Sequence, residues 1–124
     1  MWSAVNETTE CSDLTNGMYN MATIKKIAGW ESKFPAFKWC NDFNKGSISG
    51  WYLPARDELN DLCANYTKVN TILMNCGVMQ IAADTYWNSS EDTSNYSWCQ
   101  NFANGYQYLN TMYYPYRVRA VRAF

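Results

Sequence analysis

The stretch SWCQNFANGYQY, residues 97–108, decides the fold class of this chain. Its first half alternates between two faces, as the side chains of a β-strand do. Trp98, Gln100 and Phe102 form one face, and Cys99 and Asn101 form the other. The Asn104-Gly105 pair predicts a hairpin with a type I′ turn, because both central residues of that turn need a positive φ. Residues 106–108 are therefore predicted to return as a second strand.

Other strand patterns flank this hairpin. Residues 86–90, YWNSS, predict a short strand before it, and residues 117–123, RVRAVRA, predict a final strand after it. A further short strand, WYLP at residues 51–54, ends at Pro54, which cannot donate a hydrogen bond to a ladder. Most predicted strands therefore follow residue 85.

Helical patterns occupy the chain before that point. Residues 20–29, NMATIKKIAG, are predicted to form a helix that Asn20 caps and Gly29 ends. A second helix is predicted to begin at Pro35, which suits the first helical turn. Its predicted core-facing stripe consists of Phe37, Trp39, Cys40 and Phe43.

Two more helical segments follow the short strand at residues 51–54. Residues 55–66 place acids in the first turn of a helix, and residues 69–77 form a short helical or irregular segment. Helices first and strands last, without alternation, predict an α+β domain. We expect two or so helices packed on small antiparallel sheets, with a C-terminal hairpin and a final strand.

Tyrosine is concentrated in the last third of the chain. Seven of its ten tyrosines are Tyr86, Tyr96, Tyr106, Tyr108, Tyr113, Tyr114 and Tyr116. The segment NGYQYLNTMYYPY, residues 104–116, has neither strand nor helix periodicity, so these rings are either loosely packed core or displayed. Tyrosine gives a large, stiff contact at low entropic cost, and Asn and Ser add adaptable hydrogen bonding. We expect most of these rings to be displayed and Tyr86, beside Trp87, to be packed.

Composition excludes several classes of function. The net charge of −1 provides no field that would attract nucleic acid or an anionic membrane. Histidine is absent, which excludes Ser-His-Asp, Cys-His and His-metal chemistry. The five cysteines form no CxxC pair, so they are reduced thiols or contribute one or two disulfides, with at least one thiol left unpaired.

The length of 124 residues suits one domain, residues 1–124. Residues 1–15 are expected to be loose, or to form an edge strand through Trp2 and Val5. No apolar run reaches the roughly 18 residues that cross a bilayer, and the N-terminus lacks the pattern of a secretory signal. We expect no membrane insertion, and a domain that is the C-terminal module of a longer protein.

Several short motifs occur in a definite order. They are NGMYNMATI, WYLPARDEL, YWNSSE, FANG and VRAVRAF, and the key positions are Trp51, Leu53, Pro54, Glu58, Leu59, Tyr86, Trp87, Ser89, Ser90, Glu91, Phe102, Gly105, Val118, Arg119, Val121 and Arg122. From about residue 16 onward the chain resembles the Lcl C-terminal-type domain, which implies a C-type-lectin-like fold. Ala55 and Asn88 depart from the family pattern, which has small hydroxyl residues there.

The last forty residues are similar to the variable proteins of diversity-generating retroelements, in which adenine-bearing codons are rewritten. This resemblance implies a hypervariable Tyr/Asn/Ser-rich surface formed by residues 92–116. The candidate ligand-binding residues are Asp92, Thr93, Asn95, Tyr96, Cys99, Asn101, Tyr106, Tyr108, Asn110, Tyr113, Tyr114 and Tyr116. Trp87, Trp98 and Phe102 interrupt them as expected framework positions.

Two further expectations concern charged residues. Arg119 and Arg122 lie on opposite faces of the last predicted strand, so one of them is expected to pair with a carboxylate, Glu58 or Glu91. Sugar-binding C-type lectins hold calcium with EPN or QPD and a WND triplet, and WCND at residues 39–42 matches only with an inserted Cys. We expect no metal site, no catalytic residue and no cofactor.

The sequence thus predicts a ligand-binding or receptor-recognition module that is not an enzyme. Its expected partner is a protein or glycan receptor on another cell or particle, and not nucleic acid. The resemblance implies an adhesin-like role on a phage virion or a bacterial surface. Two alternatives stay open: a structural or homo-oligomerising lectin-like domain, and a formylglycine-generating-type oxidase, which needs two reactive thiols in one cleft.

Overall fold

The computed structural model describes residues 1–43 and 48–123. Within them the helices are α1 Gly17–Ile24, α2 Trp30–Lys33, α3 Pro35–Asp42, α4 Arg56–Ala64 and α5 Tyr66–Asn75. The strands are β1 Trp51–Tyr52, β2 Thr85–Glu91, β3 Tyr96–Asn101, β4 Gln107–Thr111 and β5 Val121–Arg122. Strands β1 and β5 pair in one antiparallel sheet, and a second antiparallel sheet has the order β2-β3-β4. The predicted α+β class is confirmed, with more and shorter helices than expected.

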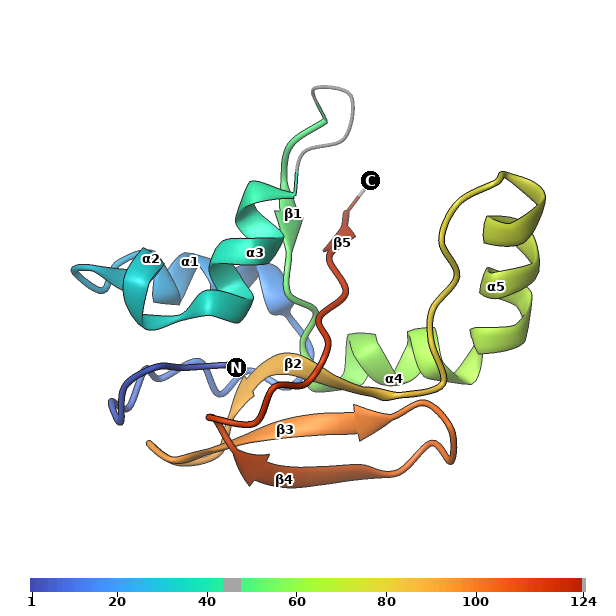
Figure 1. Ribbon diagram of the computed structural model, residues 1–124. Helices are drawn as coiled ribbons and strands as arrows, with labels where there is room; N and C mark the ends of the chain where they lie inside the picture. The colour runs from blue at the N-terminus through green and yellow to red at the C-terminus, as the bar shows by residue number, and fades with distance from the viewer. Residues whose placement is uncertain (44–47, 124) are drawn as a thin grey trace.

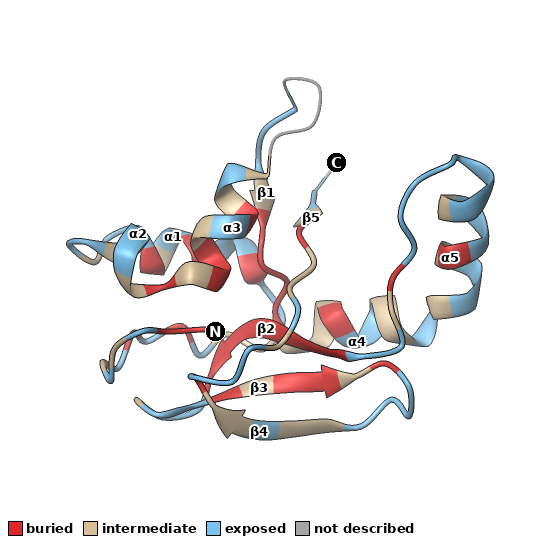
Figure 2. Ribbon diagram, viewed as in Figure 1, coloured by how far each residue is buried: buried red, intermediate tan, exposed pale blue. Residues whose placement is uncertain are grey.

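The two-stranded sheet lies between helices α1–α3 and helix α5. Helices α1, α2 and α3 gather on one side of β1, and α5 stands on the other side of β5 (Figure 1). Strand β2 is buried along its whole length, although it is an edge strand of the three-stranded sheet (Figure 2). It is covered because the segment after β4 returns beside it: Trp87 N donates to Arg117 O at 2.9 Å, and Arg117 N donates to Thr85 O at 3.1 Å.

The hairpin lies where it was predicted, but its turn is of another type. Asn101 N donates to Tyr106 O at 2.9 Å, which closes a four-residue loop over residues 102–105. Gly105 alone has a positive φ in this loop, 79°, so the type I′ prediction is wrong. Asn104 instead accepts a hydrogen bond from Tyr106 N at 2.9 Å through Oδ1, which stabilises the longer loop.

The first helix begins earlier than predicted. Asn16, not Asn20, is the N-cap of α1, and its Oδ1 accepts from Tyr19 N at 3.0 Å. Asn20 is fully buried inside the helix, where its Nδ2 donates to Asp13 O at 2.8 Å and Ser89 Oγ at 3.0 Å. Gly29 has φ 74° and precedes α2 instead of ending one long helix. Buried partners therefore override the capping preference of Asn20.

The stripe predicted for α3 is only partly core. Phe37 and Cys40 are fully buried, but Trp39 is 48% exposed. Trp39 packs on Phe43 with ring centroids 5.2 Å apart, and Phe43 packs in turn on Trp51 at 5.0 Å. An eight-residue helix can bury one narrow face, and Trp39 lies beside that face.

The N-terminal segment is neither loose nor a strand. Trp2 is fully buried in the main core and packs edge-on against Phe37 at 5.0 Å. Its Nε1 donates to Asn88 O at 2.7 Å, and its backbone nitrogen donates to Met112 O at 2.9 Å. No strand is assigned in residues 1–15, so the edge-strand expectation is wrong, and the buried Trp2 anchors the start of the segment instead of leaving it loose.

The two carboxylates expected to bind arginine have other partners. Glu58 accepts from Gly17 N at 2.6 Å, Ala55 N at 2.9 Å and Tyr52 Oη at 2.8 Å. Because the N-cap residue is alanine, only the Glu58 half of a capping box can form at the start of α4.

The second carboxylate, Glu91, is buried and accepts from Thr9 N at 2.9 Å, from Thr9 Oγ1 at 2.9 Å and from Glu10 N at 3.1 Å. Glu10 has φ 64°, which turns successive N–H groups toward one carboxylate. The expected arginine pairing is wrong, since Arg122 Nε instead donates to Ser49 O at 2.7 Å. The predicted final strand also shortens to Val121–Arg122.

No helix in the described residues has the length and apolar character needed to span a bilayer.

Candidate functional site

The register of the three-stranded sheet places the candidate residues on its faces. Tyr108 of β4 pairs with Cys99 of β3, and Cys99 pairs with Trp87 of β2. Directly paired residues share a face, and alternation along the chain puts positions 106 and 110 on the face of Tyr108. Asn101, which closes the hairpin with Tyr106, belongs to the same face.

The segment after β4 folds back onto this face. The ring of Tyr116 lies 5.0 Å from the ring of Trp87 and 6.5 Å from that of Tyr108. Tyr114 stacks on Tyr116 with centroids 5.5 Å apart and planes 21° apart. We call the resulting surface the tyrosine face; it consists of Asn101, Tyr106, Tyr108, Asn110, Tyr114 and Tyr116.

A network of side-chain hydrogen bonds fixes the centre of the tyrosine face. Tyr116 Oη accepts from Asn110 Nδ2 at 2.7 Å and from Tyr108 Oη at 3.4 Å. Tyr108 Oη also lies 3.2 Å from Thr85 Oγ1. Burial, followed by the contact with Tyr108, raises the pKa of Tyr116 to about 12, so its phenol stays protonated at neutral pH. Thr85 was not predicted as a site residue, because the predicted strand begins at Tyr86, whereas β2 begins at Thr85.

Three exposed tyrosines belong to the segment that carries this centre. Tyr106 is 71% exposed, Tyr113 is 51% exposed and Tyr114 is 50% exposed. Tyr86 is buried at 5%, as expected from its place beside Trp87, and its Oη accepts from Ala82 N at 3.0 Å. The expectation that most rings of this segment are displayed and that Tyr86 is packed is thus confirmed in position; their role in binding stays a prediction.

Cys99 does not belong to the surface. It is fully buried, because β3 is the central strand and the rings of Trp87 and Tyr116 flank its position. Its Sγ donates to Tyr108 O at 3.3 Å, and burial raises its pKa to about 12. The prediction that Cys99 faces outward is wrong. Trp98, assigned to the interior, is only half-buried.

The remaining candidates lie at the other end of β3. Asp92, Thr93 and Asn95 are exposed in the turn between β2 and β3, where the amides of Asp92 and Thr93 donate to Tyr96 O at 3.0 and 3.2 Å. Tyr96 pairs with Thr111 and therefore lies on the face opposite Tyr108. The structure thus divides most of the exposed candidates into the tyrosine face and a turn group, which consists of Asp92, Thr93 and Asn95.

Tyr113 connects the turn end of the sheet to the N-terminal segment. Its Oη donates to Asn6 Oδ1 at 2.5 Å, so residues near Asn6 border the candidate surface. Sequence reasoning missed this neighbour because the two residues are far apart in the chain.

The opposite face of the sheet carries exposed apolar side chains that were not predicted as site residues. Leu109, 38% exposed, pairs with Trp98, and the guanidinium of Arg56 lies 5.1 Å from the Trp98 ring centroid. The sequence did contain a signal for Leu109: neighbouring side chains of a strand point to opposite faces, so Leu109 lies on the face opposite Tyr108.

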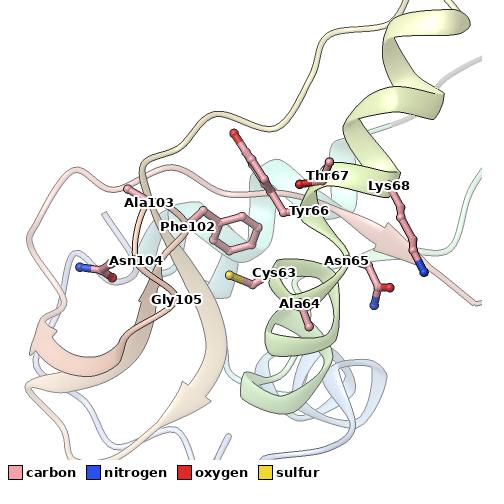
Figure 3. A pocket seen from close by; sticks show the side chains of 10 residues that line it. All are labelled: Cys63, Ala64, Asn65, Tyr66, Thr67, Lys68, Phe102, Ala103, Asn104 and Gly105. Carbon is pink, nitrogen blue, oxygen red and sulfur yellow. The ribbon is translucent and has the colours of Figure 1, made fainter.

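Two hollows are lined by residues that do not belong to the tyrosine face. One, of about 450 Å³, lies between the junction of α4 and α5 and the hairpin loop. Figure 3 shows Phe102, Tyr66 and Cys63 between these two walls, whereas Asn104 and Lys68 point outward. The other, of about 520 Å³, is lined by residues of α4 and α5 together with Tyr52 and Val121. The described residues contain no cluster of three or more His, Cys, Asp or Glu that could hold a metal ion.

All five cysteines are free thiols. Cys11, Cys40 and Cys99 are buried, and Cys76 is exposed. Burial raises the pKa of Cys11 to about 11 and raises those of Cys40 and Cys63 as well. These thiols are therefore held in the poorly nucleophilic protonated form.

The fold and the surface together define a small α+β domain that displays aromatic and amide side chains on one face of its three-stranded sheet. The chain belongs to the Lcl C-terminal domain family, whose sequence model matches residues 1–122. A search of curated proteins gives no match.

Proposed function

We propose that this domain is a ligand-binding or receptor-recognition module that uses the tyrosine face and the adjoining turn group. The observation that carries the proposal is the exposure of Tyr106, Tyr113 and Tyr114 outside both hydrophobic cores. Rigid aromatic side chains mixed with amides and hydroxyls are the composition of protein surfaces that bind varied partners. The partner is a protein or glycan receptor on another cell or particle.

The proposal includes a source of variation. The similarity to variable proteins of diversity-generating retroelements accounts for side chains of one restricted set on a lectin-like scaffold. The fold supports this in one respect: exposed positions such as Tyr106 can change without disturbing the cores. A near-copy of the 3′ coding end that differs at adenines, beside a reverse-transcriptase gene, is the expected genomic context, and its absence would remove this part of the proposal.

Binding is tested by staining panels of bacterial and host cells with a fluorescent tetramer of the domain. We expect the double change Tyr106→Ala and Tyr114→Ala to abolish staining that the unaltered domain gives. Tyr19→Ala is the matched control, because Tyr19 is 58% exposed on α1, outside the tyrosine face. Equal staining by all three proteins, or no staining across the panels, would contradict the proposal.

An oligomerising role is the second candidate, and one observation favours it. Ile72 and Met74 of α5 and the following Met79 are 62%, 58% and 82% exposed. Exposed apolar patches of this kind often mark contacts between proteins. Light scattering at several concentrations separates the two candidates, because a receptor-binding module needs no change of mass with concentration. The oxidase alternative is disfavoured by the burial of Cys11, Cys40 and Cys99, which keeps these thiols out of an open cleft and raises the pKa of each.

A further inference from the structure

Strand β4 leaves one edge of the three-stranded sheet open. The order β2-β3-β4 makes β2 and β4 the two edge strands, and the segment after β4 covers β2 through the backbone bonds of Trp87 and Arg117. Helix α4 packs on β2 and β3. Among the described residues, no segment pairs with the outer edge of β4, which lies at the margin of the molecule (Figure 1).

The register of β4 shows which of its backbone groups point toward β3. At one end of the pairing, Asn101 N donates to Tyr106 O at 2.9 Å, and at the other end Met112 N donates to Asn95 O at 3.0 Å. Residues of an antiparallel pair exchange such bonds at every second position. Every second residue from Tyr106 to Met112 therefore directs its N–H and C=O groups toward β3.

The three residues between them, Gln107, Leu109 and Thr111, direct their backbone groups away from β3. Thr111 is already engaged, because its amide donates to Asn110 Oδ1 at 2.8 Å and its carbonyl accepts from Tyr114 N at 3.2 Å. The backbone groups of Gln107 and Leu109 find no partner among the described residues. The open edge therefore consists of two N–H groups and two C=O groups.

Strand β4 lacks the features that usually protect an exposed edge. Natural edge strands are commonly shielded by lysine, by proline or by a bulge. The sequence of β4, QYLNT, contains no charged residue and no proline, and its register with β3 is unbroken. The covered strand β2, by contrast, has an irregular register between Trp87 and Glu91. The edge of β4 is therefore suited to pairing with another strand.

A second copy of β4 supplies the matching groups in one register. In an antiparallel pairing about a two-fold axis at Tyr108, Gln107 of each copy faces Leu109 of the other. Each such pair exchanges two hydrogen bonds, so the two pairs use every free group of both edges. An axis at Leu109 would face Gln107 with the engaged Thr111. An axis at Gln107 would face Leu109 with Gly105, whose N–H and C=O are bonded within the hairpin.

We propose that this domain pairs with a second copy of itself through β4, which joins two three-stranded sheets into one of six strands. This inference goes beyond the proposed receptor binding and does not depend on it. Directly paired residues share a face, so the two Tyr108 side chains lie next to each other and both tyrosine faces lie on the same side of the joined sheet. Two copies of the candidate surface side by side favour bivalent binding.

Sedimentation equilibrium from about 10 μM to about 1 mM tests the pairing. We expect the average mass to rise from 14.4 kDa toward twice that value. Leu109→Pro removes an outward N–H group and no bond to β3, and proline is tolerated at such a position of an edge strand. It should raise the dissociation constant at least about tenfold. Leu109→Ala is the matched control, because it keeps the N–H group, and should change the constant less than about threefold.

Two further measurements identify the paired surface. Ile72→Asp places a charge on the exposed apolar side of α5 and should leave the dissociation constant unchanged. In the unaltered domain, a higher protein concentration should slow amide hydrogen exchange at Gln107 and Leu109, but not at Tyr108, whose amide already points to β3. This second measurement decides the inference by itself if Leu109→Pro does not fold.

A constant mass would overturn the inference. So would an association that survives Leu109→Pro or is lost with Ile72→Asp, or exchange at Gln107 and Leu109 that does not depend on concentration. Cell staining that requires Tyr106 and Tyr114 would then still support the proposed function, so the two failures are distinguishable.

Discussion

Glu58 Oε1 lies 2.6 Å from the backbone nitrogen of Gly17, a residue 41 positions earlier in the chain. The same oxygen accepts from Ala55 N at 2.9 Å at the start of α4. One carboxylate therefore joins the first turns of α1 and α4. The close approach also explains the glycine, because a Cβ at position 17 would lie 2.6 Å from Leu53 O and 2.7 Å from Glu58 Oε1.

Gly17→Ala should therefore destabilise the domain. The added methyl group collides with backbone as well as with the carboxylate, and overpacking of this kind costs about 1–3 kcal/mol. Met18→Ala is the control, since Met18 is 52% exposed on the same helix and should change the free energy of unfolding by less than about 0.5 kcal/mol. Urea denaturation measures both, and equal midpoints would contradict the role of Gly17.

Glu91 should make stability depend on pH with a definite sign. Burial outweighs its hydrogen bonds and raises the pKa of the Glu91 carboxyl above its ordinary value of 4.5. The folded state therefore holds this proton more tightly than the unfolded state does, and the stabilisation is lost as pH rises through the folded pKa. From pH 4 toward 7, the free energy of unfolding should fall for the natural protein relative to Glu91→Gln. Parallel pH profiles for the two proteins would contradict this.

Exposed and supported tyrosines should differ in their effect on stability. Tyr106→Ala should change the free energy of unfolding by less than about 0.5 kcal/mol, because the ring is 71% exposed. Tyr116→Ala should lower it by about 1–3 kcal/mol, since its ring packs on Trp87 and its hydroxyl accepts from Asn110. Thermal and urea unfolding measure the stability of each variant. Equal stability of the two variants would contradict the prediction.

The cysteines should react in an order set by burial. Cys76 is exposed and should be alkylated by iodoacetamide within minutes at pH 8, whereas Cys11, Cys40 and Cys99 should react only after unfolding. Peptide mass spectrometry after timed quenching identifies each site. Rapid modification of Cys99 in the folded protein would show that the tyrosine face is more open than described.

Local patterns predicted the helix of α4 and the position of the β3–β4 hairpin because their signals lie close together in sequence. Alternation in β3 identified two faces correctly, but it could not tell which face other segments cover. Cys99 was therefore expected to be exposed, although Trp87 and Tyr116, from other parts of the chain, cover its position.

Long-range contacts also decided the other corrections. Asn20 is of a residue type that often caps helices. Its buried side-chain amide instead donates a hydrogen bond to Ser89, 69 positions away in the chain. Glu91 looked like a partner for arginine, but amides of residues 9 and 10 satisfy it. In the candidate site, composition identified displayed tyrosines, whereas the part played by Thr85 and Asn6 depended on folding.

The hydrogen bond from Trp2 N to Met112 O decides how the domain should be attached in binding experiments. It places the start of the chain beside the residue that precedes Tyr113, while β5 runs away from the three-stranded sheet (Figure 1). A biotin tag or sensor-chip coupling at the N-terminus would sterically hinder the binding of a macromolecule to the surface near Tyr113. Immobilisation through the opposite terminus leaves the aromatic surface free, and comparing the two orientations gives a direct check on steric access.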